Sequence, residues 1–230
     1  MFFDKKFIIL ITDGVFMIDY NLCYIFGAGP ISVPLRFKPC PNQDYVIAAD
    51  AGYKFLYGQG IKPDLLVGDL DSLGFAPEDI ELVQFPTVKD DTDMMLAINE
   101  AKKRGYNKFI IYGGIGGRPE FTLANLQILS NIVNSGDLCY FVGSGSLITA
   151  VKNNSLIFDE RFRGRVSIFA AGESAQGVTL SGLKYTLSNA VIKSNFPIGV
   201  SNEFINNKGS ISVTDGTLFV IYDDCNPLFL

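Results

Sequence analysis

Short apolar runs alternate with amphipathic segments along the first part of the chain. The runs predict buried strands and lie at residues 23–26, 45–49, 65–67, 82–85, 108–112 and 138–142. Between them, apolar positions at helical spacing and capping residues predict helices over residues 52–59, 89–104 and 122–134. Alternation of strands with helices is typical of an α/β fold whose sheet is mostly parallel.

The pattern changes after Gly143-Ser144-Gly145, where helical periodicity ends. Shorter strand-like runs then follow one another at 147–151, 155–158, 166–170, 178–180, 190–192, 211–213 and 218–222. Turn residues separate them at the spacing of a sandwich, and Asp215-Gly216 predicts a hairpin turn between the last two runs. This half predicts an antiparallel β-sandwich.

The first 22 residues look like an addition to these two halves. An apolar run at 7–11 is too short for the core of a signal peptide, and Asp13 and Asp19 interrupt the apolar residues after it. Asp13-Gly14 predicts a hairpin instead, and Met17 is an alternative start. We therefore expect an N-terminal extension at 1–22, an α/β domain at 23–145 and a β domain at 146–230.

The amino-acid composition excludes several kinds of catalytic site, metal site and partner. The chain has no histidine, which excludes Ser-His and Cys-His nucleophile systems and histidine-bound metals. A formal net charge of −5 without a basic block argues against nucleic acid as the main partner, and no apolar run is long enough to span a membrane. Four cysteines lie far apart, and Cys23 and Cys139 fall in apolar runs, so we expect buried thiols and a cytoplasmic protein.

Two carboxylates follow the run at 65–67. Asp69 and Asp71 are spaced two apart in Gly68-Asp69-Leu70-Asp71-Ser72, so in extended backbone both project from the same side. Hard oxygen donors at the end of a buried strand suit Mg²⁺, which usually takes one or two carboxylates together with substrate phosphates. The alternative is a polar turn with two solvated aspartates, because this motif is weak evidence on its own.

Other strand ends also carry glycine or acidic residues. Gly27-Ala28-Gly29-Pro30 can place backbone N–H groups around phosphate, although the third glycine of a dinucleotide fingerprint is missing. Asp50 ends the run at 45–49. Four glycines precede Arg118 in the stretch 113–118, and the planar guanidinium favours phosphate. In an α/β sheet these strand ends lie at one edge, where ligands bind.

The stretch Lys89-Asp90-Asp91-Thr92-Asp93 opens the second predicted helix. Aspartate and threonine are good capping residues, and the helix dipole favours acids in the first turn. Capping explains part of this motif but gives no reason for Lys89. A role in phosphate or metal binding is therefore the second interpretation.

These segments, taken in order, resemble the thiamine pyrophosphokinase family. The motifs that carry the resemblance are Ala49-Asp50-Ala51-Gly52, Gly60-Ile61-Lys62-Pro63-Asp64, Gly68 to Ser72, Lys89 to Asp93, Gly116-Gly117-Arg118, Thr122 to Asn125, Gly182 to Tyr185, and Val200 to Phe204. The resemblance implies a Rossmann-like catalytic domain that binds ATP and a β-sandwich that binds thiamine. It also implies Mg²⁺-dependent transfer of pyrophosphate from ATP to the hydroxyl of thiamine, release of AMP, and a homodimer with active sites between subunits.

The resemblance also implies residue roles. Asp69, Asp71 and Asp93 bind Mg²⁺, and Asp71, Asp93 and Arg118 form the catalytic set. The predicted contacts to the substrates are Gly29, Asp50, Ser72, Lys89, Thr92, Gly116, Gly117 and Glu120 on the ATP side and Tyr185, Ser201 and Asn202 on the thiamine side. The ring of Tyr185 offers an aromatic face to the cationic thiazolium.

The chain departs from the family pattern after Arg118. The family usually has an aspartate and often a histidine where this chain has Glu120 and Phe121, and Ala51 replaces a usual glycine. Two other functions stay open: a thiamine- or nucleotide-binding protein without turnover, and a pyrophosphokinase for another hydroxymethyl compound such as a pterin. An oxidoreductase that uses the glycines at 27–29 is disfavoured because the fingerprint is incomplete.

Overall fold

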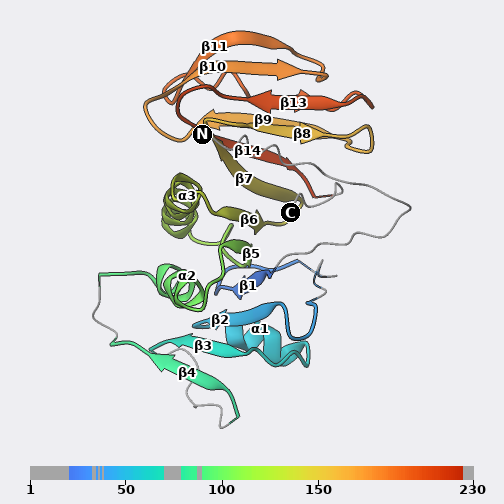
Figure 1. Ribbon diagram of the computed structural model, residues 1–230. Coiled ribbons are helices and arrows are strands. Elements are labelled where there is room, and N and C mark those ends of the chain that lie inside the picture. Colours follow the sequence, from blue (N-terminus) through green and yellow to red (C-terminus); the bar gives the residue numbers. More distant parts are fainter. Residues whose placement is uncertain are drawn as a thin grey trace, which may run out of the picture.

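The computed structural model describes residues 21–32, 35, 37, 39–69, 79–86 and 90–224. Its centre is a ten-stranded sheet in the order β12-β9-β14-β7-β6-β5-β1-β2-β3-β4 (Figure 1). The first six strands in sequence are β1 (Cys23–Phe26), β2 (Tyr45–Ala49), β3 (Leu65–Gly68), β4 (Glu81–Gln84), β5 (Lys108–Tyr112) and β6 (Leu138–Val142). All six are parallel, which confirms the expected α/β half.

Helices cover both faces of this parallel part. Buried residues of α2 (Asp93–Lys103) and α3 (Pro119–Asn134) join one hydrophobic core, whereas α1 (Gly52–Gly58) packs into another core with residues of β1, β2 and β3. Figure 1 shows α2 and α3 on one side of the sheet and α1 on the other. The third helix begins at Pro119, earlier than its predicted start at residue 122, because proline suits the first helical turn.

The sheet continues into the second half with antiparallel pairing. β7 (Ser146–Lys152) pairs antiparallel with β6, and β14, β9 and β12 extend the same sheet. The bounds of these strands are β9 (Arg165–Ala170), β12 (Asn202–Glu203) and β14 (Thr217–Asp223). The change of composition at 143–145 therefore coincides with a change of pairing direction within one sheet.

A separate antiparallel sheet packs on this second half. Its order is β11-β10-β13-β8, with bounds β8 (Ser155–Phe158), β10 (Ser174–Ser181), β11 (Leu187–Lys193) and β13 (Gly209–Ser212). Both sheets contribute to one core, in which Val178 and Ile211 of the small sheet join Ile168 and Val220 of the large one. The architecture is thus a mixed sheet plus an antiparallel sheet; the finer names Rossmann-like and β-sandwich, and the domain limits, stay predictions.

One turn prediction is wrong, and another lies outside the described residues. Asp215-Gly216 does not close a hairpin, because β13 pairs with β8 and β10 whereas β14 pairs with β7 and β9. The turn carries the chain from one sheet to the other, and the local sequence signal is the same for both outcomes. The hairpin predicted at Asp13-Gly14 lies outside the residues that the structure describes.

Candidate active site

The strand order reverses at the carboxyl edge of the parallel strands. β1 lies between β2 and β5, so the chain winds in one direction from β1 to β4 and then crosses back through α2 to β5. Ligands of open α/β sheets bind outside the carboxyl ends of the strands at such a reversal. Here the two glycine-rich stretches at 27–30 and 113–118 follow the two strands at the reversal.

These two stretches are packed backbone to backbone. The N–H of Gly27 donates to the carbonyl of Tyr112 and the N–H of Gly29 donates to the carbonyl of Gly113, each at 2.8 Å. A Cβ on Gly29 would lie 2.6 Å from the carbonyl oxygen of Gly113. No side chain fits there, so glycine is required at this position for the two strand ends to meet.

Side chains at the start of α3 hold the loop that follows β5. The N–H of Gly116 donates to the hydroxyl of Thr122 at 3.1 Å, and the buried amide of Asn125 donates to the carbonyl of Gly114 at 2.6 Å. Gly116 and Gly117 have φ angles of 90° and 70°, which favour glycine. Thr122 and Asn125 belong to a motif of the family resemblance, but sequence reasoning assigned them no role. Their signal was a hydroxyl and an amide in the first turns of a helix after a glycine loop.

Arg118 and Glu120 contact each other at the start of α3. The Nε and Nη2 atoms of Arg118 lie 2.7 and 2.6 Å from Oε1 of Glu120, and the guanidinium lies 4.5 Å from the ring centroid of Phe121. A hydrogen bond from its own backbone N–H and the bond from Arg118 lower the pKa of Glu120. All three side chains are exposed, so the guanidinium is within reach of a ligand at this edge.

The described acidic residues of the predicted site also lie at the carboxyl edge. Asp69 directly follows β3, and Asp50 directly follows β2 with a φ of 48°, a left-handed conformation that aspartate tolerates better than most residues. The N–H of Asp50 donates to the carbonyl of Val67 at 2.8 Å, and a Cβ on Gly68 would lie 3.2 Å from the Cα of Asp50. The ends of β2 and β3 are therefore in tight contact, which places Asp50 beside Gly68, the residue before Asp69.

The helix α2 starts at the same edge. Its cap is Thr92, whose hydroxyl accepts from the N–H of Met95 at 3.2 Å, and its first residue is Asp93. The capping interpretation is thus confirmed for Thr92, while its contact with ATP stays a prediction. Because α2 crosses back along the sheet from this edge to the start of β5, Asp93 begins the helix near the strand ends that precede Asp50 and Asp69.

Three predicted site residues lie outside the described residues: Asp71, Ser72 and Lys89. Among the residues that the structure describes, no group of three or more histidine, cysteine or acidic residues is placed to hold a metal ion. The described donors at the carboxyl edge are carboxylates, the ligand type that Mg²⁺ prefers, so the chemistry of Asp69 and Asp93 fits this ion.

The residues predicted to bind thiamine lie together in the second half. Asn202 is buried, and its side-chain oxygen accepts from the N–H groups of Tyr185 and Glu203, both at 2.9 Å. Its amide nitrogen donates to the carbonyl of Tyr185 at 2.7 Å. Tyr185 is exposed and lies beside Lys184, whose ammonium is 5.5 Å from the ring centroid and 2.7 Å from a carboxylate oxygen of Glu203. Ser201 is exposed with a φ of 60°.

The thiamine-side residues are far from the acidic ones within one chain. Asn202 belongs to β12 at one edge of the ten-stranded sheet, whereas Asp69 follows β3 near the other. Eight strand spacings of about 4.8 Å separate these strands, which is about 38 Å along the sheet. A single side chain is far too short to cross that distance.

Comparison with known proteins identifies the family. The family model described as "Thiamin pyrophosphokinase, catalytic domain" matches residues 38–140, and the one described as "Thiamin pyrophosphokinase, vitamin B1 binding domain" matches residues 155–218. The chain belongs to the thiamine pyrophosphokinase family. It is therefore an enzyme, a kinase of the transferase class, and the expectation from its motifs is confirmed.

Relatives of this family resemble the chain over most of its length. A curated thiamine pyrophosphokinase from Bacillus subtilis is 28% identical over 185 residues, which cover 76% of this chain and 85% of the relative. The crystal structure of a thiamin pyrophosphokinase from Geobacillus thermodenitrificans is 26% identical, with a TM-score of 0.76 and coverage of 88% and 97% of the two chains. A family protein from Enterococcus faecalis is 27% identical, with a TM-score of 0.74 and coverage of 89% and 99%.

Proposed function

We propose that this enzyme transfers the pyrophosphoryl group of ATP to the hydroxyl of thiamine with the help of Mg²⁺, and releases AMP. The observation that carries the proposal is the shared edge: Asp69 and Asp93 lie at the same edge of the sheet as the two glycine-rich stretches at the reversal. Backbone N–H groups and carboxylate-bound Mg²⁺ are the partners that a triphosphate needs. Family membership supplies the two substrates.

The residues at this edge suit phosphoryl transfer. An incoming hydroxyl is repelled by the phosphate oxygens, and a bound Mg²⁺ supplies the charge that screens them. The guanidinium of Arg118 adds a positive group at the start of α3, and a phosphate that it binds through Nε and Nη2 would replace Glu120 at these atoms. Catalysis is then mostly positioning and charge stabilisation, and any general base is a carboxylate, for which Asp71 and Asp93 are the candidates.

We assign the thiamine contacts to the second half of the chain. The exposed ring of Tyr185 offers a flat face to the thiazolium cation, and exposed Ser201 offers a hydroxyl to the pyrimidine. The side chain of Asn202 is hydrogen-bonded to the main chain of Tyr185. Asn202 therefore contributes to thiamine binding by positioning Tyr185 as well as by any direct contact.

We further propose that the enzyme is a homodimer in which each site combines two chains. The separation of about 38 Å along the sheet between β12 and β3 supports this, because thiamine on Tyr185 and ATP near Asp69 of one chain do not meet. Exposed apolar side chains near Ser201, those of Phe196, Ile198 and Val200, are available for a contact between chains. A two-fold arrangement places the β half of one chain over the acidic edge of its partner.

We place the enzyme in the cytoplasm. The described cysteines Cys23, Cys40 and Cys139 are free, as is usual in a reducing compartment. Burial raises the pKa of the Cys23 and Cys139 thiols, so these two behave as core residues. Within the described part of the chain, no helix has both the length and the apolar character to cross a membrane.

The decisive experiment measures AMP formation from ATP and Mg²⁺ with thiamine and, separately, with a hydroxymethylpterin. The parent enzyme should form AMP with thiamine alone. Asp69→Asn, Asp71→Asn and Asp93→Asn should each reduce the rate roughly a thousandfold, because each loses a metal ligand in the transition state. Asp79→Asn changes an exposed acid outside the proposed set and should keep the parent rate.

Melting curves of all variants separate loss of activity from loss of fold. AMP release with the pterin instead of thiamine would assign the enzyme to a different hydroxymethyl substrate. Thiamine binding without AMP release would show a binding protein. Near-parent rates in folded Asp69→Asn, Asp71→Asn and Asp93→Asn would overturn the metal assignment.

A further inference from the structure

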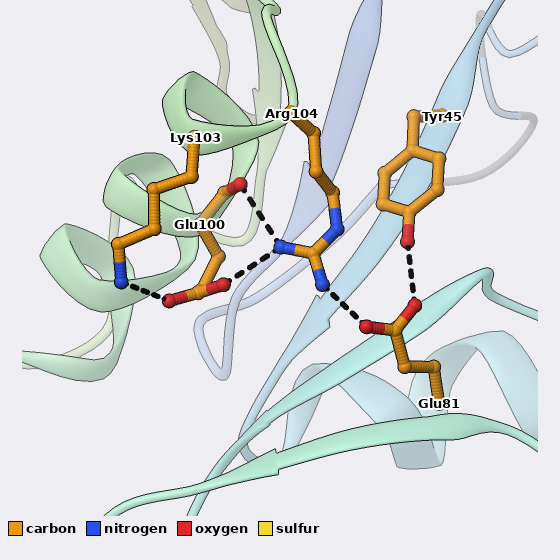
Figure 2. A network of polar contacts seen from close by, with 5 residues as sticks. All are labelled: Tyr45, Glu81, Glu100, Lys103 and Arg104. Atoms are coloured by element: carbon orange, nitrogen blue, oxygen red, sulfur yellow. Dashed lines mark hydrogen bonds and ion pairs between the residues drawn. The ribbon is translucent and has the colours of Figure 1, made fainter.

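A network of charged and aromatic side chains lies at the edge of the sheet opposite the proposed site. Arg104, directly after α2, donates from Nη2 to Oε1 of Glu81 at 2.5 Å and from Nη1 to Oε2 of Glu100 at 2.7 Å. The second carboxylate oxygen of Glu81 accepts from the hydroxyl of Tyr45 at 3.3 Å. The Nζ atom of Lys103 lies 2.6 Å from Oε1 of Glu100. Figure 2 shows Arg104 between the two glutamates.

The network joins three elements at their ends. Glu81 is the first residue of β4, Tyr45 is the first residue of β2, and Arg104 follows the last residue of α2. The side chain of Glu100 is only 9% exposed and that of Arg104 24%, so the bond between them is partly shielded from solvent. Hydrogen bonds from Lys103 and Arg104 lower the pKa of Glu100, which keeps this carboxylate charged.

The strand that Arg104 holds is the edge strand β4. β4 has four residues and pairs with β3 alone among the described strands. A short edge strand has half the ladder bonds of a central one, and additional contacts fix its place. The charge-assisted bond to Arg104 is such a contact, and it comes from outside the sheet.

The other end of β4 contacts the backbone at Gly68 and Asp69, the second of which is a proposed metal ligand. The N–H of Phe85 donates to the carbonyl of Gly68 at 3.1 Å, and the amide of Gln84 donates to the carbonyl of Asp69 at 3.5 Å. In sequence, β4 is the one element between Asp69 and Asp93 in the described part of the chain. The helix that begins with Asp93 ends at Lys103, directly before Arg104, so the bond from Arg104 to Glu81 closes a frame made of β3, β4 and α2.

We propose that Arg104 and Glu81 are positioning residues that set the placement of Asp69 relative to Asp93. This inference rests on the proposed function of the two acids as Mg²⁺ ligands. Holding β4 and α2 together at one edge fixes the spacing of the acidic residues at the other. Small displacements of such groups have large effects on transfer, because the geometry of the bound phosphates is set by the ligands.

The test compares variants of the frame with a matched ion pair of the same helix. Glu81→Ala and Arg104→Lys remove or weaken the bond to β4. Asp137→Ala removes the Lys102–Asp137 pair, which is 2.7 Å long and joins α2 to the segment before β6. Each protein is examined for Mn²⁺ affinity in the presence of ATP by electron paramagnetic resonance, for its melting temperature, and for kcat and the KM of thiamine.

Both frame variants should bind Mn²⁺ about tenfold more weakly and show a lower kcat, with the thiamine KM unchanged within about twofold. The two changes should combine less than additively in Mn²⁺ affinity, because both break the Arg104–Glu81 contact, although each also removes a bond of its own, to Glu100 or to Tyr45. Asp137→Ala should lose stability without a change in Mn²⁺ affinity. Hydrogen exchange at the Phe85 amide should quicken in the frame variants alone.

Two outcomes contradict this inference in distinguishable ways. In the first, the frame variants match Asp137→Ala in every measurement and keep the Mn²⁺ affinity of the parent enzyme. This result would show that the network only stabilises the fold. A folded parent enzyme that binds no Mn²⁺ with ATP would overturn the proposed function itself, and the positioning role with it.

Discussion

At the scale of single residues, the buried amide of Asn202 fixes the backbone that carries the exposed ring of Tyr185. Its three hydrogen bonds reach the N–H and carbonyl of Tyr185 and the N–H of Glu203. Asn202→Ala leaves these groups without partners, so we expect a loss of about 1–3 kcal/mol in the free energy of unfolding. Urea denaturation measures this loss.

The same variant also tests the link to thiamine. A displaced Tyr185 should raise the thiamine KM by roughly tenfold or more, equivalent to about 1.4 kcal/mol, while the KM of ATP stays at the parent value. Asn131→Ala, an exposed change on α3, is the control and should alter neither constant. A destabilised Asn202→Ala protein with an unchanged thiamine KM would limit Asn202 to a structural role.

At the scale of elements, the packing of glycines decides whether the ends of β1 and β5 can meet. Gly29→Ala places a Cβ against the carbonyl of Gly113, so the ends of β1 and β5 must separate. We expect a loss of about 1–3 kcal/mol in stability and a higher KM for ATP, with little effect on thiamine. Steady-state kinetics with each substrate varied in turn checks this.

A second glycine provides the matched control. Gly58 ends α1, and a Cβ there would meet nothing within 4 Å. Gly58→Ala should therefore keep the parent KM for ATP and gain up to about 1 kcal/mol in stability from the restricted unfolded chain. Equal behaviour of the two variants would show that Gly29 is not needed for the ATP site.

Elements were largely predictable because their signals are local. The strand runs at 23–26 and 108–112 and the helix at 52–59 match β1, β5 and α1 closely. Pairing partners were not predictable: Asp215-Gly216 reads as a hairpin turn whichever sheet receives the next strand. Two sets of hydrogen bonds join residues that are distant in sequence: those between Asn202 and the backbone of Tyr185, and the one from Arg104 to Glu81. No local sequence pattern indicates either set.

At the scale of the whole molecule, the continuous sheet sets the distance between the two halves of the proposed site. The halves are joined through the pairing of β6 with β7, not by a loose joint at 143–145 alone. A chain therefore does not fold its own Tyr185 onto its own Asp69 without breaking the sheet. This argues for a site completed by a partner chain, and a complementation experiment tests it.

The last prediction uses two variants that are each inactive or weak alone. Asp69→Ala removes an acidic residue, and Tyr185→Ala removes the aromatic face. The two proteins are unfolded, mixed in equal amounts and refolded, so that about half of the dimers are hybrids by random assortment. In a shared-site dimer, each hybrid carries one site with both lesions and one with neither, so activity should recover to roughly one quarter of the parent value.

A control mixture separates complementation from improved refolding. Asp69→Ala mixed with Arg118→Ala places both lesions in the α/β half, so no hybrid contains an intact site and activity should stay at the level of the components. Hybrid formation is checked by mass spectrometry of intact dimers. If the first mixture contains hybrids but stays as inactive as the control, each site is built within one chain. The thiamine contacts would then come from residues nearer to β3 than Tyr185, because eight strand spacings still separate β12 from β3.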